Sequence, residues 1–329
     1  MKLANFDYNL PKELIAQHPL KERDSAKLMV LNRKDKSIEH CVFKDIVNYF
    51  RKEDLIILND TRVLSCRLEG KRLTGGRVEV LLLNQEKGMT FKAMIKPARL
   101  RLNEEIKFNN GSLVGRLTER NRISFSANSV QEVYSHGQVP LPPYIKRIPD
   151  ESDKDYYQTV YAIKDGAIAS PTAGLHFTKE LMKDIQGLGV NFASLTLHVG
   201  LGTFKPVKTD NIEDHIMESE LFNIPDKTIK CLEKAKKNNA RVCAVGTTSL
   251  RSLETYALGL RDGVTNLYIT PGFKFNLADC LLTNFHLPCT TLFMLVCAFA
   301  GEDFAKKAYK IAVEKEYRFY SYGDAMLIL

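Results

Sequence analysis

The stretch at residues 169–206 reads ASPTAGLHFTKELMKDIQGLGVNFASLTLHVGLGTFKP and follows the order loop, helix, strand, loop. Thr178 is a predicted N-cap, and the apolar residues at 181, 182, 185 and 188 fall on one helical face. Glycines at 187 and 189 offer left-handed positions that end a helix. Residues 192–197 form a largely apolar run, which is typical of a buried strand in a parallel sheet. This pattern predicts an α/β domain.

Two loops rich in small residues flank this helix and strand, and each loop carries one histidine. They contain Thr172, Gly174 and His176 before the helix, and His198, Gly200, Gly202 and Thr203 after the strand. Because loops at the carboxyl ends of strands build the ligand crevice of open α/β sheets, we expect the two loops to converge on one site. Both loops also fit ordinary tight turns, with the histidines as satisfied structural residues.

The composition describes a soluble protein with a basic excess. A chain of 329 residues with 44% hydrophobic and 26% charged residues predicts two globular domains. The net charge of +8 favours a polyanionic partner such as nucleic acid, although a solvated basic surface also accounts for it.

The cysteines and the apolar runs bear on the compartment. Seven cysteines without a C-x-x-C pair fit a reducing cytosol, and the N-terminus has no apolar signal core. The most apolar run, at residues 291–300, is shorter than the roughly 20 residues that span a membrane. We therefore expect a cytoplasmic protein that makes no membrane contact.

The character of the sequence changes near residue 62. Between residues 63 and 139 there is no helical period, and short β-rich runs at 77–83, 90–95, 104–108, 113–118 and 122–126 alternate with turn residues. Such even spacing predicts a small barrel or sandwich. Residues 61–125 hold 14 lysines and arginines against six acidic residues, an excess as large as that of the whole chain. We expect Arg67, Arg72 and Arg77 to contact nucleic-acid phosphates, with solubility as the competing explanation.

Helices and strands alternate again after residue 145. The pattern predicts a helix at 225–238, strands at 241–245, 267–270 and 281–283, a buried helix at 291–300 and a final strand at 325–329. The fold class is therefore α/β, with a larger, discontinuous α/β domain at residues 1–61 and 146–329. A smaller all-β barrel domain is inserted at residues 62–145.

A candidate anion site lies where the strand at 241–245 meets the following helix. Thr247, Thr248 and Ser249 stand at the start of that helix and Arg251 follows, so backbone N–H groups, hydroxyls and a guanidinium can hold a carboxylate or phosphate. Hydroxyl residues at this position are also common N-caps. His286 follows another predicted strand and either lines the same crevice or sits in the core. The chain lacks G-x-G-x-x-G, P-loop and H-E-x-x-H motifs.

Seven stretches together resemble the S-adenosylmethionine:tRNA ribosyltransferase-isomerase family of queuosine biosynthesis. They are residues 6–11, 58–63, 170–178, 195–204, 246–251, 284–291 and 320–324. The resemblance spans nearly the whole chain. It implies an α/β domain with an inserted β-barrel, a monomer without a metal or bound prosthetic group, and S-adenosylmethionine as co-substrate.

The resemblance also implies an unusual reaction. The enzyme moves and isomerises the ribosyl moiety of S-adenosylmethionine onto 7-aminomethyl-7-deazaguanine at the tRNA wobble position, and the products are epoxyqueuosine, adenine and methionine. We expect His176 or His198 to act as base or acid, since imidazole titrates near working pH. We expect Thr247, Thr248, Ser249 and Arg251 to hold the methionine carboxylate. The remaining substrate-binding candidates are Thr172, Gly174, Gly200, Gly202, Thr203 and His286, with Asp60 and Asp324 for ribose hydroxyls or the aminomethyl ammonium.

Two other functions compete with this hypothesis. An S-adenosylmethionine-dependent RNA methyltransferase is the nearest enzyme, but the glycine-rich nucleotide loop after the first strand is missing. A non-catalytic tRNA-binding protein would use the basic β-rich segment, and it would leave the histidine-bearing loops unexplained.

Overall fold

The computed structural model describes residues 1–200 and 207–329. Its larger unit is built on a mixed sheet, in which nine strands of these described residues pair in the order β15-β13-β12-β3-β14-β16-β17-β1-β2. In this order the strands are β15 (Asp262–Thr265), β13 (Glu220–Asn223), β12 (Asn191–Leu197), β3 (Leu55–Asn59), β14 (Val242–Val245), β16 (Cys280–Asn284), β17 (Ala325–Ile328), β1 (Lys27–Leu31) and β2 (Ile38–Val42). The four central strands β12, β3, β14 and β16 run parallel, so their carboxyl ends share one edge of the sheet.

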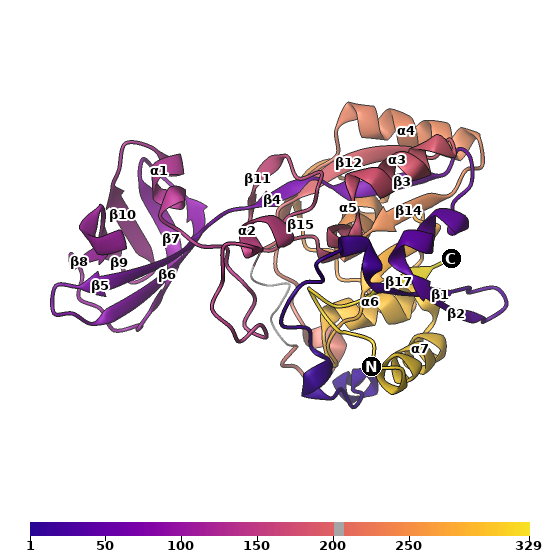
Figure 1. The fold of residues 1–329 in the computed structure, drawn as a ribbon, viewed down its shortest axis with the longest axis horizontal. Coiled ribbons are helices and arrows are strands. Elements are labelled where there is room, and N and C mark those ends of the chain that lie inside the picture. The colour runs from indigo at the N-terminus through magenta and orange to yellow at the C-terminus, as the bar shows by residue number, and fades with distance from the viewer. Residues whose placement is uncertain (201–206) are drawn as a thin grey trace. The chain divides into compact units, whose positions relative to one another are not determined.

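Both faces of the sheet are buried, which explains why its central strands are apolar without alternation. In β3, Leu55 and Ile57 enter one hydrophobic core while Ile56 and Leu58 enter the other. The first core is covered by α4 (Asp226–Lys237), α5 (Thr247–Ala257), α6 (Thr291–Ala300) and α7 (Glu302–Glu314). The second is covered by the 3₁₀ helix η4 (Phe43–Tyr49) and by α3 (Lys179–Gly187). In Figure 1, α6 and α7 are the yellow helices that pack against each other.

Short 3₁₀ turns complete the larger unit. They are η1 (Leu3–Phe6), η2 (Lys12–Leu14), η3 (Arg23–Ser25), η6 (Thr172–His176) and η8 (Ile212–Asp214). A two-stranded sheet pairs β4 (Thr61–Val63) with β11 (Lys164–Ala167).

The stretch at 169–206 folds as its sequence predicts over its described residues. The Thr178 hydroxyl accepts a hydrogen bond from the Leu181 amide at 3.1 Å and starts α3, and β12 follows. The apolar run near residue 291 is the buried helix α6. Within residues 1–200 and 207–329, no helix is both long and apolar enough to cross a membrane.

The smaller unit contains a closed barrel made from a fully described part of the chain. Its strands pair antiparallel in the order β10-β7-β6-β5-β8-β9. They are β5 (Arg67–Arg72), β6 (Arg77–Gln85), β7 (Thr90–Lys96), β8 (Glu105–Phe108), β9 (Leu113–Glu119) and β10 (Arg122–Ser126). The unit also holds α1 (Val130–Ser135), α2 (Asp153–Tyr156) and the 3₁₀ turn η5 (Asn109–Gly111). These barrel strands are purple in Figure 1.

The barrel confirms the five predicted β-rich runs and adds a strand that the sequence concealed. Strand β5 reads RLEGKR, so charged residues obscure its alternation, yet Leu68 and Gly70 are buried while Glu69 and Lys71 are exposed. Gly70 makes room for an aromatic ring, because a Cβ there would lie 2.7 Å from Phe108.

The predicted strand at 267–270 is wrong, because the edge strand lies earlier, at β15. The Thr265 hydroxyl ends β15: it bonds the Thr255 hydroxyl at 2.7 Å and accepts from the Leu267 amide at 3.3 Å. These bonds turn the chain away from the sheet, and no local pattern in the sequence announces them.

The contacts divide the chain into two compact units, residues 1–62, 143–147 and 158–329 on the one hand and residues 63–142 and 148–157 on the other. A mixed α/β unit and a closed antiparallel barrel confirm the predicted fold class. The domain boundaries taken from the sequence, at 61/62 and 145/146, stay a prediction.

Candidate active site at the carboxyl edge of the parallel strands

The larger unit holds a cavity at the edge where its parallel strands end. Its lining comes from the segments that follow β12, β14 and β16, from the loop through η6, from α6 and from a turn before β17. The lining residues are Ser170, Pro171, Thr172, Ala173, Val199, Gly246, Thr247, Thr248, Thr283, Asn284, His286, Leu292, Tyr320 and Ser321. The space between them measures about 470 Å³, part of it open to solvent. This is the position where open α/β sheets bind ligands.

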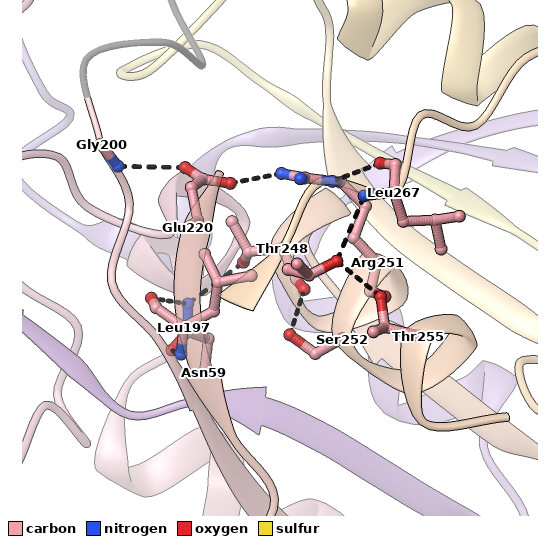
Figure 2. A network of polar contacts seen from close by, with 10 residues as sticks. Asn59, Leu197, Gly200, Glu220, Thr248, Arg251, Ser252, Thr255 and Leu267 are labelled. Atoms are coloured by element: carbon pink, nitrogen blue, oxygen red, sulfur yellow. Dashed lines mark hydrogen bonds and ion pairs between the residues drawn. The ribbon is translucent and has the colours of Figure 1, made fainter. Parts of the chain in front are cut away.

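Asn59, the last residue of β3, joins the end of β12 to the starts of α5 and β4. Its Nδ2 donates to the Leu197 carbonyl at 2.9 Å and to the Thr248 hydroxyl at 3.3 Å. Its Oδ1 accepts from the amides of Leu197 at 3.0 Å and Thr61 at 3.2 Å. Figure 2 shows this side chain between β12 and α5. The sequence places Asn59 at the polar end of an all-apolar strand, where either ligand contacts or turn contacts are expected, but it does not reveal these partners.

The start of α5 presents the anion-binding features that the sequence suggested. Gly246 has φ +87, a conformation that favours glycine, and turns the chain from β14 into the helix. Thr247 and Thr248 line the cavity, and the first N–H groups of a helix have no acceptor within it. Ser249 does not line the cavity, because its fully buried hydroxyl donates to the Val245 carbonyl at 2.7 Å.

Arg251 is engaged behind the cavity and does not line it. Its guanidinium forms a buried ion pair with Glu220 of β13, the side chains being 3% and 4% exposed. Its Nε also donates to the Leu267 carbonyl at 3.1 Å, and Glu220 accepts from the Gly200 amide at 3.0 Å (Figure 2). The Arg251 guanidinium, which we expected to hold the methionine carboxylate of the donor, is therefore already paired with Glu220. Sequence reasoning missed this glutamate.

His198 follows β12 and sits beside the cavity. Its Nδ1 bonds the Thr61 hydroxyl at 2.8 Å, and Gly166 packs so closely that a Cβ there would lie 2.6 Å from the ring. Burial lowers the pKa of His198, while the carboxylates of Asp60 and Asp165 oppose that shift. The ring is not among the cavity lining, although its neighbour Val199 is.

His176 is buried at the end of η6 and also stands outside the lining. Its ring lies 4.9 Å from that of Phe43, centroid to centroid. Burial lowers the pKa of His176 to about 4, and the Asn284 amide is the main opposing group. At neutral pH the imidazole is therefore uncharged. The structure brings the two histidine-bearing loops to one cavity without placing either histidine in its wall.

His286 is the histidine that faces the cavity. Its Nε2 bonds the Thr283 hydroxyl at 2.8 Å, and its backbone amide donates to the Tyr309 hydroxyl at 3.1 Å. The Tyr8 hydroxyl donates to the His286 carbonyl. Burial lowers the pKa of His286 to about 3, so the ring is neutral at physiological pH. A neutral imidazole has one donor and one acceptor nitrogen, and with Nε2 bonded to Thr283 at most Nδ1 is left for a bound molecule.

The two carboxylates predicted to bind substrate hold backbone and hydroxyl groups instead of lining the cavity. Asp60 accepts from the Thr196 hydroxyl at 2.6 Å, and burial raises its pKa. Asp324 accepts from the amides of Lys27 at 2.9 Å and Arg318 at 2.7 Å, and burial raises its pKa as well.

The glycine and threonine candidates of the two loops also differ in whether they line the cavity. Thr172 lines the cavity. Gly174 is required for packing, since a Cβ there would lie 1.9 Å from the Tyr161 hydroxyl oxygen. Gly200 donates its amide to Glu220, while Gly202 and Thr203 lie outside the described residues. In the described part of the chain, no three histidine, cysteine, aspartate or glutamate side chains group as metal ligands.

Comparison with known proteins identifies the family. A family model described as "Queuosine biosynthesis protein" matches residues 3–328. A relative from Sulfurihydrogenibium sp. (strain YO3AOP1), named S-adenosylmethionine:tRNA ribosyltransferase-isomerase, is 50% identical over 336 residues and 100% of each chain. The chain belongs to this ribosyltransferase-isomerase family. A relative of the same name from Aquifex aeolicus (strain VF5) is 46% identical, again over 100% of each chain.

A solved member of the ribosyltransferase-isomerase family supports the same conclusion. The crystal structure of S-adenosylmethionine tRNA ribosyltransferase from Thermotoga maritima is 34% identical, with a TM-score of 0.58, and the alignment covers 99% of this chain and 100% of that one. The family resemblance predicted from the sequence is confirmed, and the chain is an enzyme of this family. Both competing functions, the methyltransferase and the non-catalytic tRNA-binding protein, lose their support.

Proposed function

We propose that this enzyme transfers and isomerises the ribosyl moiety of S-adenosylmethionine onto 7-aminomethyl-7-deazaguanine at the wobble position of tRNA. The products are epoxyqueuosine in the tRNA, free adenine and free methionine. The observation that carries the proposal within the structure is the cavity at the carboxyl edge of the parallel strands, lined by hydroxyls, an amide and a neutral imidazole. Full-length membership of the ribosyltransferase-isomerase family supports S-adenosylmethionine and tRNA as the substrates.

The chemistry follows from the positive sulfur of the donor. A sulfonium acidifies the adjacent ribose 5′ carbon, so a base can remove that proton to give an ylide, and opening of the sugar then expels adenine. The opened sugar is a vinyl sulfonium with an aldehyde at C1′, because its C4′–O4′ bond has broken. The tRNA amine adds to C4′, and the ylide that this regenerates at C5′ bonds to C1′ and closes the carbon ring. The resulting alkoxide displaces methionine from C5′ and forms the epoxide. The protein must supply a base, protonate adenine, position the amine and exclude water.

For the donor, we propose that its methionine carboxylate lies at the start of α5. Thr247 and Thr248 face the cavity there, and the helix N-terminus favours a negative charge. Ser249 and Arg251 support this position from behind, through Val245 and Glu220 respectively. In this proposal Arg251 is a positioning residue, and the cavity-lining Thr172 and His286 contact the rest of the donor.

The acid–base roles of His176 and His198 stay proposals. Both rings have pKa values lowered by burial, which favours the neutral, proton-accepting form. His198 sits next to the cavity-lining Val199, and His176 faces the amide of the cavity-lining Asn284. Single-turnover adenine release by His198→Ala and His176→Ala tests them, and two wild-type rates would remove both from the mechanism.

Isotopic labels in S-adenosylmethionine test the proposed reaction against its competitors. With ribose-labelled donor and substrate tRNA, we expect label in the tRNA and one free adenine for each modified base; with methyl-labelled donor, we expect all label in free methionine. Methyl label in tRNA would show a methyltransferase instead. Binding of tRNA with no adenine release would show a binding protein.

We further propose that the enzyme is a cytoplasmic monomer that holds no prosthetic group. All seven cysteines, each of which lies in the described residues, are free, which suits a reducing compartment. Sedimentation of the purified protein with and without tRNA measures the assembly, and a dimer in the absence of tRNA would contradict the proposal.

A further inference from the structure

Three cations stand side by side on the outer surface of the barrel. Strand pairing places Lys71 of β5 directly opposite Lys107 of β8 and, on its other side, opposite Arg77 of β6. Side chains of directly opposed residues share one face of a sheet, and neighbouring strands are about 4.8 Å apart. The three positive charges thus form a short row across three strands.

Among the described residues, the cations of this row form no ion pair with a carboxylate; the two glutamates nearest along the same strands, Glu69 and Glu79, pair with Arg67 and Lys96 instead. All three side chains of the row are exposed. Four other barrel arginines contrast with them, because each is bound to glutamate: Arg67 to Glu69 and Glu79, Arg72 to Glu104, Arg116 to Glu105, and Arg122 to Glu86 and Glu119. Of the arginines that the sequence suggested as phosphate contacts, only Arg77 keeps its charge uncompensated.

Such a row destabilises the barrel on its own. Like charges directly opposite each other on neighbouring strands repel, and here the central lysine has a cation on both sides. An arrangement with this cost is explained most simply by an anion that binds there and offsets the repulsion.

The shape of the surface fits a polymeric anion. The three cations border a hollow of about 1,890 Å³, measured with its open solvent, to which Lys96, Asn109 and Asn110 also contribute, together with the ion-paired Glu69 and Glu79. Two strand spacings separate the outer cations of the row by about 10 Å, and one strand of a duplex carries roughly three phosphates over that length of its helix axis. The asparagine amides can donate further hydrogen bonds to phosphate oxygens.

We propose that Lys71, Arg77 and Lys107 form a phosphate-binding row that holds the sugar–phosphate backbone of the tRNA substrate. This inference rests on the proposed function, since tRNA is the polyanion that the proposed reaction requires. The row contacts phosphates and not base edges, so it contributes affinity and position without reading sequence.

A triple variant, Lys71→Gln, Arg77→Gln and Lys107→Gln, tests the row in the full-length enzyme. The measurement is the dissociation constant for unmodified tRNA as a function of KCl concentration. We expect the log–log salt slope to fall by about 2, since each lost phosphate contact removes roughly 0.7 to 0.9, and binding at low salt to weaken at least about tenfold. The matched control, Lys87→Gln, Lys92→Gln and Arg120→Gln, removes three exposed cations from barrel positions outside the hollow. An unchanged slope in the first variant, or an equal loss in the control, would overturn the inference.

Two further readouts keep the inference separate from folding and from the proposed reaction. Without RNA, the first variant should have a urea midpoint equal to or above wild type, because repulsion is relieved; a lower midpoint would assign the row a structural role and overturn the inference. Its affinity for S-adenosylmethionine should be unchanged. If wild-type enzyme transferred no labelled ribose, the proposed function would fail, while a lost salt slope would still establish the row as an RNA contact.

Discussion

At the scale of single residues, the polar side chains around the cavity divide between holding the fold and facing the open space. Asn59 bonds backbone groups and the Thr248 hydroxyl, and Asp324 accepts from two backbone amides. Thr247 and His286 line the cavity. Burial keeps two of the histidines, His176 and His286, neutral at physiological pH.

These two buried histidines predict how stability depends on pH. Their native pKa values, about 4 and about 3, lie below the value of about 6.5 for an exposed imidazole. Between pH 6.5 and 4 the unfolded chain therefore binds protons that the native protein does not, so the free energy of unfolding falls as the pH falls. Each histidine contributes at most about 1.4 kcal/mol per pH unit.

Urea unfolding at pH 7, 6 and 5 checks this dependence. The His286→Gln variant should lose less stability than wild type between pH 6 and pH 5, by up to about 1.4 kcal/mol. A variant with the same pH slope as wild type would show that His286 is protonated in the native protein, and its assignment as a neutral group would be wrong.

At the scale of elements, α5 is the part of the fold that the site depends on. Its first turn faces the cavity, while Arg251, one turn later, joins it to β13 through the buried Glu220. The same glutamate holds the Gly200 amide, so a single carboxylate positions both α5 and the beginning of the second loop. This explains why a guanidinium near an anion site need not contact the substrate.

A double-mutant cycle separates the positioning role of Arg251 from direct substrate binding. Arg251→Met alone removes the guanidinium from the buried Glu220 carboxylate, and it should cost about 3–5 kcal/mol of stability. Adding Glu220→Gln should recover most of that loss and should also restore the affinity for S-adenosylmethionine, measured by calorimetry. Recovered stability with affinity still lost would instead place Arg251 on the donor carboxylate.

At the scale of the whole molecule, the sequence predicts the architecture because the helices and strands show in local patterns of apolar residues. The apolar periods of α3, β12 and α6, and the β-rich runs of the barrel, depend on burial that recurs along the chain. The loops after the parallel strands could be assigned to one edge of the sheet because the carboxyl ends of parallel strands meet there. Strand β5 was concealed because a small barrel leaves alternate positions exposed, and those positions here are charged.

The details of the site depend on partners far apart in sequence, and a single sequence does not reveal them. Thr172, Thr247, Thr248 and His286 were identified as candidates and do line the cavity. The pairing of Arg251 with Glu220 joins two elements with no shared motif. The positions of His176 and His198 just outside the cavity wall depend on tertiary packing against Phe43 and Gly166.

The account's central claim is that the cavity at the carboxyl edge of the parallel strands holds the ribosyl donor. A crystal structure of the enzyme with S-adenosylmethionine tests this claim most directly. We predict the methionine carboxylate at the first turn of α5, within hydrogen-bond distance of Thr247 or Thr248, and the donor in contact with His286. A donor bound at any other surface, with this cavity empty, would contradict the account.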